Sequence, residues 1–137
     1  MKVLPSDKIK EALNILSGEA LVYAPLVRGD VSGYFKWADN PEDDLALDLL
    51  NTYMSPKNVV MPQTEKMYDF EAPGKEAQVT EVAIAEGKRV IFGMKACDLK
   101  ALEALDLAFL TKEYEDEFYK ARRKDLTVIA QACYQPG

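Results

Sequence analysis

Apolar positions in the first third of the chain change from helical to extended spacing. They recur every three to four residues over 6–16, which predicts a short amphipathic helix with Ser6 as its N-cap. Residues 19–27 and 31–37 are instead rich in β-branched and aromatic side chains, and the turn-forming sequence Arg28-Gly29-Asp30 separates them. These two runs therefore predict the strands of a β-hairpin.

The middle of the chain is punctuated by prolines. Asn40 and Pro41 are followed by three acidic residues, a pattern typical of a helix N-terminus, and we predict a helix from 41 to about 52. Beyond Ser55-Pro56 the pattern predicts a largely extended stretch that includes residues 57–61 and 66–70.

The second half has the pattern of a parallel sheet with helical crossovers. Residues 89–93 form an apolar run without alternation, as expected for a strand covered on both faces. Helices are predicted from Asp98, as the cap, to Phe109 and over 115–124, and residues 126–130 form a second apolar strand. This βααβ order favours a single α/β domain over residues 1–137, with a small mixed or parallel sheet and an N-terminal helix plus hairpin.

The net charge of −6 is unevenly distributed along the chain. Residues 38–87 hold eleven acidic and three basic residues, and no basic stripe of the kind that binds phosphates is present, so nucleic acid is not an expected partner. The longest uncharged run, residues 126–137, is shorter than the roughly 20 residues that cross a bilayer, so no membrane association is expected either. The first ten residues do not form a signal-peptide apolar segment, which predicts a cytoplasmic location.

Two cysteines are the main candidates for chemistry, because the chain has no histidine to act as a general base or zinc ligand. Cys97 and Cys133 each follow a predicted strand by three or four residues. Ligands of open α/β sheets bind beyond the carboxyl ends of the strands, so we expect both thiols at one edge of the sheet. Cys97 also precedes a predicted helix, whose free N–H groups favour a thiolate.

Spacing alone leaves the role of the two thiols open. They could hold part of a metal site, although two thiolates complete neither a zinc site nor an iron–sulfur cluster. They could instead form a thiol switch with a Cys97–Cys133 redox pair in the cytoplasm. A third hypothesis is an assembly module in which both cysteines are buried and inert.

Several motifs in residues 55–137 occur in the order seen in a known family. Their sequences are Ser55-Pro56-Lys57 with Pro62-Gln63 and Glu65, Ile91-Phe92-Gly93-Met94-Lys95-Ala96-Cys97-Asp98-Leu99 with Leu105-Asp106, Tyr119 with Arg122-Arg123, and Cys133 with Pro136-Gly137. This series resembles the iron–sulfur β subunits of cytoplasmic hydrogenase/sulfur reductases, the sulfhydrogenase β subunits, together with the corresponding iron–sulfur subunits of anaerobic sulfite reductases. Ala96 stands where the family usually has proline.

The resemblance implies an iron–sulfur electron-transfer subunit. Such a subunit passes electrons between two other subunits, one that bears flavin and one that catalyses the reduction of protons, sulfur or sulfite. The family continues with a Cys-x-Cys pair and a ferredoxin-like domain, so we expect this chain to be the N-terminal fragment of a longer subunit, without catalytic activity of its own. Cys97 and Cys133 would then be cofactor ligands that join the missing pair around a [4Fe–4S] cluster in the full-length protein, with no cofactor in the fragment alone. The acidic segment 38–87 is a candidate docking surface.

Overall fold

The computed structural model describes residues 3–74, 77–82, 87–111 and 115–133. Pro136 and Gly137 of the last motif lie outside them. The helices are α1 (Ile9–Ser17), α2 (Ala96–Phe109) and α3 (Glu117–Lys124), with 3₁₀ turns η1 (Ser6–Lys8), η2 (Trp37–Asp39) and η3 (Pro56–Val59). The strands are β1 (Leu21–Arg28), β2 (Val31–Lys36), β3 (Asp44–Leu45), β4 (Tyr68–Glu71), β5 (Gln78–Glu81), β6 (Arg89–Lys95) and β7 (Leu126–Gln131).

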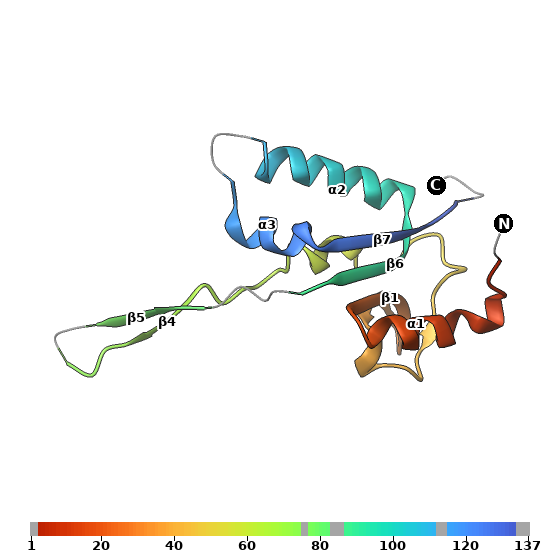
Figure 1. Ribbon diagram of the computed structural model, residues 1–137, viewed down its shortest axis with the longest axis horizontal. Coiled ribbons are helices and arrows are strands. Elements are labelled where there is room, and N and C mark those ends of the chain that lie inside the picture. The colour runs from red at the N-terminus through yellow and green to blue at the C-terminus, as the bar shows by residue number, and fades with distance from the viewer. Residues whose placement is uncertain (1–2, 75–76, 83–86, 112–114, 134–137) are drawn as a thin grey trace.

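A mixed five-stranded sheet organises the molecule, and the α/β class is confirmed (Figure 1). Its order is β2-β1-β6-β7, with β3 also paired to β1. The predicted hairpin forms as β1 and β2, and the two apolar runs of the second half form the neighbouring parallel strands β6 and β7. The crossover between β6 and β7 contains α2 and α3, so the βααβ unit is confirmed.

Two hydrophobic cores lie on opposite faces of this sheet. On one face α1 packs Leu13 against Val90 and Trp37, while α2 and α3 cover Ile91 on the other face. Val90 and Ile91 are consecutive in β6, so their side chains point to opposite faces and both are buried. The central strand is therefore covered on both sides, as its unbroken apolar run predicts. None of the helices among the described residues is long and apolar enough to cross a membrane.

The helix predicted from 41 to about 52 is wrong. That segment instead contains the short strand β3, in which Leu45 pairs with Leu26 of β1, and the next amide, of Ala46, donates to the Pro25 carbonyl at 2.8 Å. The β6 strand pairs only with residues 21–23 of β1, so the backbone groups of β1 beyond that point need another partner. An extended chain supplies it, and this requirement outweighs the local helix-start signal.

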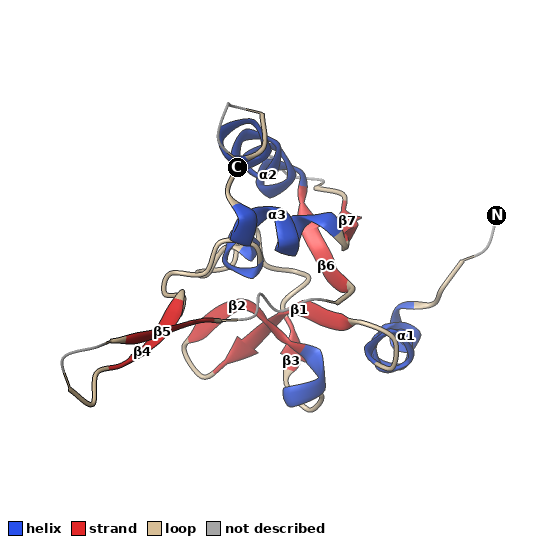
Figure 2. Cartoon of the chain, turned by 60° about the vertical axis from the view of Figure 1, so that its left-hand side comes forward, coloured by secondary structure: helices blue, strands red, loops and turns tan. Residues whose placement is uncertain are grey.

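The extended conformation predicted for residues 57–61 is also wrong, because η3 forms there. Pro56 occupies its first turn, and the Ser55 hydroxyl accepts a hydrogen bond from the Lys57 amide at 3.4 Å. The turn directs Val59 and Val60 into the core beneath α2 and α3. Residues 66–70 lie partly in β4, which pairs with β5 in a separate two-stranded sheet that projects away from the body (Figures 1 and 2).

Candidate functional site

Cys97 and Cys133 lie just beyond the carboxyl ends of neighbouring parallel strands. Lys95 of β6 is paired with Gln131 of β7, and each cysteine follows its strand's paired residue by two positions. Adjacent strands are about 4.8 Å apart, so the paired residues Lys95 and Gln131 lie side by side. Beyond them the chain turns into α2 after β6 and continues as coil after β7. Both cysteines are free and exposed. The structure therefore brings the two predicted site residues to one edge of the sheet.

The first turn of α2 contains Cys97, because this helix begins one residue before it. The prediction that Asp98 caps the helix is wrong: the N-cap is Lys95, and no side-chain cap bond forms. Asp98 lies too far into the first turn, and its carboxylate instead accepts bonds from the Ser55 hydroxyl at 3.0 Å and the Lys57 ammonium at 3.3 Å. The carboxylate thus fixes the start of α2, and with it Cys97, to the beginning of η3.

A second set of contacts, the edge clasp, joins β6 and β7 to the loop after β3. The Lys95 ammonium donates to the Gln131 side-chain oxygen at 2.9 Å and the Leu47 carbonyl at 3.5 Å, and the Gln131 amide donates to the same carbonyl at 2.8 Å. A cavity of about 370 Å³ is lined by this clasp, by Cys133 and by the loop residues Asp48, Leu49 and Leu50. The Lys95 ammonium therefore lies beside the cysteine-bearing edge, with the Asp48 carboxylate in the lining of the same cavity.

Tyr34 extends from β2 to the same region. Its hydroxyl donates to the carbonyl of Gly93 at 2.8 Å, at the irregularity in β6 just before the edge. Burial, with added repulsion from Asp98 and Cys97, raises the pKa of Tyr34 well above its ordinary value. The hydroxyl therefore stays protonated and keeps its bond to the strand.

The other motifs noted in the sequence, around Asp106, Tyr119 and Arg122-Arg123, connect the helices above the sheet. The Asp106 carboxylate of α2 accepts hydrogen bonds from the Tyr119 hydroxyl at 2.6 Å and from the Nε and Nη2 atoms of Arg123, both at 2.9 Å. Arg122 forms an ion pair with Glu65. The paired motif residues thus connect α2, α3 and the segment that contains Glu65.

The donor set is incomplete for a metal centre. Within the ranges that the structure describes, no group of three or more histidine, cysteine, aspartate or glutamate side chains is placed to hold a metal ion. Two thiolates suit iron–sulfur clusters or zinc, but each of these centres takes about four protein ligands. The edge therefore fits half of such a ligand set.

Fold and edge together define an α/β domain that presents a pair of thiols. Over 130 residues, 95% of this chain, it is 31% identical to sulfhydrogenase 2 subunit beta of Pyrococcus furiosus. The match covers 36% of that protein, so the chain spans about a third of the length of the curated relative it matches. No family model matches the chain, and no solved structure matches it significantly. The similarity supports the expected relationship to hydrogenase β subunits, and the comparisons do not show the expected relationship to anaerobic sulfite reductases.

Proposed function

We propose that this chain is the N-terminal domain of an electron-transfer subunit of a hydrogenase complex, with Cys97 and Cys133 as two ligands of a [4Fe–4S] cluster. One observation supports the proposal: Cys97 and Cys133 each follow by two residues one of the paired residues Lys95 and Gln131, at the ends of adjacent parallel strands. The similarity to a hydrogenase β subunit supports the electron-transfer role.

In this proposal the chain supplies two thiolates, and a Cys-x-Cys pair farther along the full-length subunit supplies the other two. The bound cluster would carry single electrons between partner subunits. The contacts of Asp98 hold the first turn of α2, and with it Cys97, in place, while the clasp fixes the end of β7 before Cys133. The Lys95 ammonium would offset the negative charge that a thiolate-bound cluster brings to the edge.

The partners in this proposal are two subunits. One bears flavin, and the other catalyses the reduction of protons, sulfur or sulfite. A cytoplasmic location belongs to the same proposal, because exposed, unpaired thiols such as Cys97 and Cys133 persist in a reducing compartment.

The thiol switch is a second candidate function, and the same geometry favours it. Two exposed free thiols on one edge are accessible to an oxidant, which would accept two electrons as both thiols lose their protons and form a disulfide. The hypothesis of buried, inert cysteines has no such support, because both residues are exposed.

Anaerobic reconstitution with iron and sulfide tests the proposal. The domain is expressed together with the region that follows it in the full-length subunit, and bound iron is counted for wild type, Cys97→Ser, Cys133→Ser and the control Thr127→Ser on β7. We expect each cysteine variant to lose about four iron atoms per chain relative to wild type and the control. Unchanged iron in both cysteine variants would refute the ligand assignment. If iron binding does not depend on these cysteines and the wild-type protein forms a Cys97–Cys133 disulfide reversibly, the thiol switch would be established instead.

A further inference from the structure

The β4–β5 ribbon has one apolar and one polar face. The register pairs Tyr68 with Glu81 and Phe70 with Val79, so these four side chains share a face. The alternate residues, Asp69, Glu71, Gln78 and Thr80, form the other face. This pattern is typical of an antiparallel sheet that packs one face against other protein groups and exposes the other face to water.

The apolar face is not covered by the described part of the chain. Tyr68, Phe70 and Val79 are 59%, 69% and 65% exposed, and neighbouring Met67 is 58% exposed. The ribbon also projects from the body in both views (Figures 1 and 2). A two-stranded ribbon is marginally stable by itself, and exposed apolar groups gathered in this way mark interaction surfaces.

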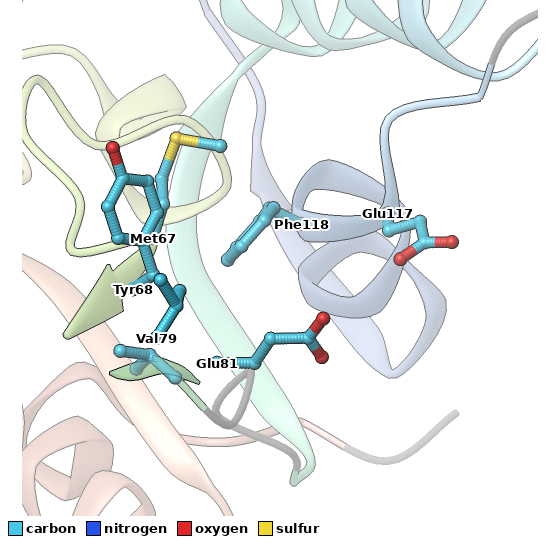
Figure 3. Close-up of a pocket in the computed structure, with 7 residues that line it drawn as sticks. Met67, Tyr68, Val79, Glu81, Glu117 and Phe118 are labelled. Carbon is cyan, nitrogen blue, oxygen red and sulfur yellow. The ribbon is translucent and has the colours of Figure 1, made fainter. Parts of the chain in front are cut away.

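A groove runs between this face and α3. Met67, Tyr68 and Val79 form one wall and Phe118 the other, around a cavity of about 620 Å³ (Figure 3). Two apolar walls that face each other across such a space fit the apolar stripe of a helix better than a single added strand.

The charges at the groove select the occupant. Glu81 and Glu117 line it, and neither has an ion-pair partner within the described ranges of the chain. Among the residues that the structure describes, no basic side chain lines the groove. A second copy of this chain would bring four carboxylates together between two molecules that each carry a net charge of −6, which disfavours self-association. A helix with lysine or arginine beside its apolar stripe would instead complement both carboxylates.

We propose that the groove between the β4–β5 ribbon and Phe118 binds an amphipathic, basic helix of a partner protein. The inference rests on the proposed function in one respect, namely that the partner belongs to the same complex. The ribbon wall of the groove lies in the acidic segment 38–87 that is expected to bind partners, while Glu117 and Phe118 of α3 lie outside that segment. Apolar contact supplies the affinity of the groove, and the two carboxylates supply its selectivity.

Two synthetic helical peptides test this proposal on the metal-free chain. They share one leucine stripe, and the flanking positions carry lysine in the first and glutamate in the second. Fluorescence anisotropy should show at least tenfold tighter binding of the lysine peptide. Hydrogen exchange should slow in residues 67–71 and 78–81 when that peptide is bound.

Matched variants use the two faces of the ribbon. Val79→Ser and Glu81→Lys should each weaken the lysine peptide at least fivefold, while Thr80→Ser and Glu71→Lys on the polar face should change its binding less than twofold. The double variant Glu81→Lys/Glu117→Lys should prefer the glutamate peptide. Circular dichroism confirms that each variant is folded.

Several outcomes would overturn the proposal: absence of binding, equal binding of both peptides, equal effects on the two faces, or a dimer that Val79→Ser dissolves. Because no iron is present, failure of this experiment leaves the cluster hypothesis intact. Loss of iron binding in the cysteine variants, in turn, has no bearing on the peptide result.

Discussion

Asparagine at position 106 removes the charge that connects α2 to α3. In the wild-type chain the Asp106 carboxylate accepts the Tyr119 hydroxyl at 2.6 Å and a two-pronged contact from Arg123, whose Nε and Nη2 are both at 2.9 Å. The ion-paired side chains are 30% and 25% exposed for Arg123 and Asp106, so water competes only in part. We expect Asp106→Asn to weaken the packing of both helices on the sheet.

The magnitude follows from the bonds that are lost. A hydrogen bond to a charged group contributes about 1.5–3 kcal/mol. The asparagine side chain keeps one oxygen that accepts a hydrogen bond from Tyr119 or Arg123. Its NH2 group would face the N–H donors of the Arg123 guanidinium, so no hydrogen bond can form between them. The free energy of unfolding should therefore fall by about 2–3 kcal/mol. At about 4 °C per kcal/mol for a chain of this size, Tm should fall by roughly 8–12 °C.

Urea and thermal unfolding measure this loss, with two further variants for comparison. Glu103→Gln removes an exposed α2 carboxylate that pairs with Lys100 at 2.7 Å, and because water screens this pair the free energy of unfolding should stay close to that of wild type. Tyr119→Phe keeps the ring contact with Phe109, at 5.2 Å between centroids, and loses only the hydroxyl, for about 1–2 kcal/mol. If the free energy of unfolding of Asp106→Asn lies within about 0.5 kcal/mol of the wild-type value, the contacts of Asp106 with Tyr119 and Arg123 do not stabilise the fold.

Three further predictions concern the two cores and the strand that leads to the cysteines. The indole N–H of Trp37, a residue that is 1% exposed, donates to the Asn14 side-chain oxygen at 2.7 Å. Asn14→Ala removes this acceptor, so thermal unfolding should show that the free energy of unfolding falls by about 1–3 kcal/mol, and no measurable fall would contradict this. Burial raises the pKa of Tyr34, so the unfolded chain releases that proton near pH 10 while the folded chain keeps it, and urea unfolding should show stability declining as pH rises above about 10. Tyr34→Phe should make the decline less steep, and the remaining decline should come from Tyr119, whose pKa is also raised by burial and by Asp106; an unchanged slope would count against the mechanism. Gly93 has φ of +75°, and a Cβ added there would lie 3.2 Å from the Pro25 side chain. Gly93→Ala should therefore lower the free energy of unfolding by about 1–3 kcal/mol, and an unchanged value would show that the strand adjusts freely.

The second half of the fold could be predicted from sequence because its signals are long and mutually consistent. Residues 89–93 and 126–130 are apolar runs separated by two helical patterns, and a parallel pairing is the topology that such a crossover permits. Once β6 and β7 are neighbours, the positions of Cys97 and Cys133 follow from counting residues. The expectation of one cysteine-bearing edge therefore required no knowledge of side-chain contacts.

The errors occur where tertiary contacts outweigh local preference. Asn40-Pro41 is a genuine helix-start pattern, but β1 extends past β6 and takes residues 44–45 as a strand partner. Asp98 has the composition of a cap, yet Ser55 and Lys57, more than forty positions earlier, bind its carboxylate. Partners this distant leave no local sequence signal.

The edge clasp was missed for the same reason. Lys95 and Gln131 look like ordinary polar strand ends, and only the pairing of β6 with β7 brings them together with the Leu47 carbonyl. One signal was available: a lysine at the end of an apolar run, here residues 90–94, directs its ammonium to the rim of the sheet. Neither the cavity nor the contacts of Lys95 with Gln131 and Leu47 follow from that signal alone.

Cadmium titration of the reduced chain tests the central claim most directly, because Cd²⁺ is a soft ion whose thiolate bonds absorb in the ultraviolet. If Cys97 and Cys133 act as one ligand pair, the wild-type chain binds one Cd²⁺ with the absorption of two thiolates, and either serine substitution abolishes tight binding. Equal tight binding by the two single variants, or no thiolate absorption in the wild-type chain, would show that the two cysteines do not form a shared site.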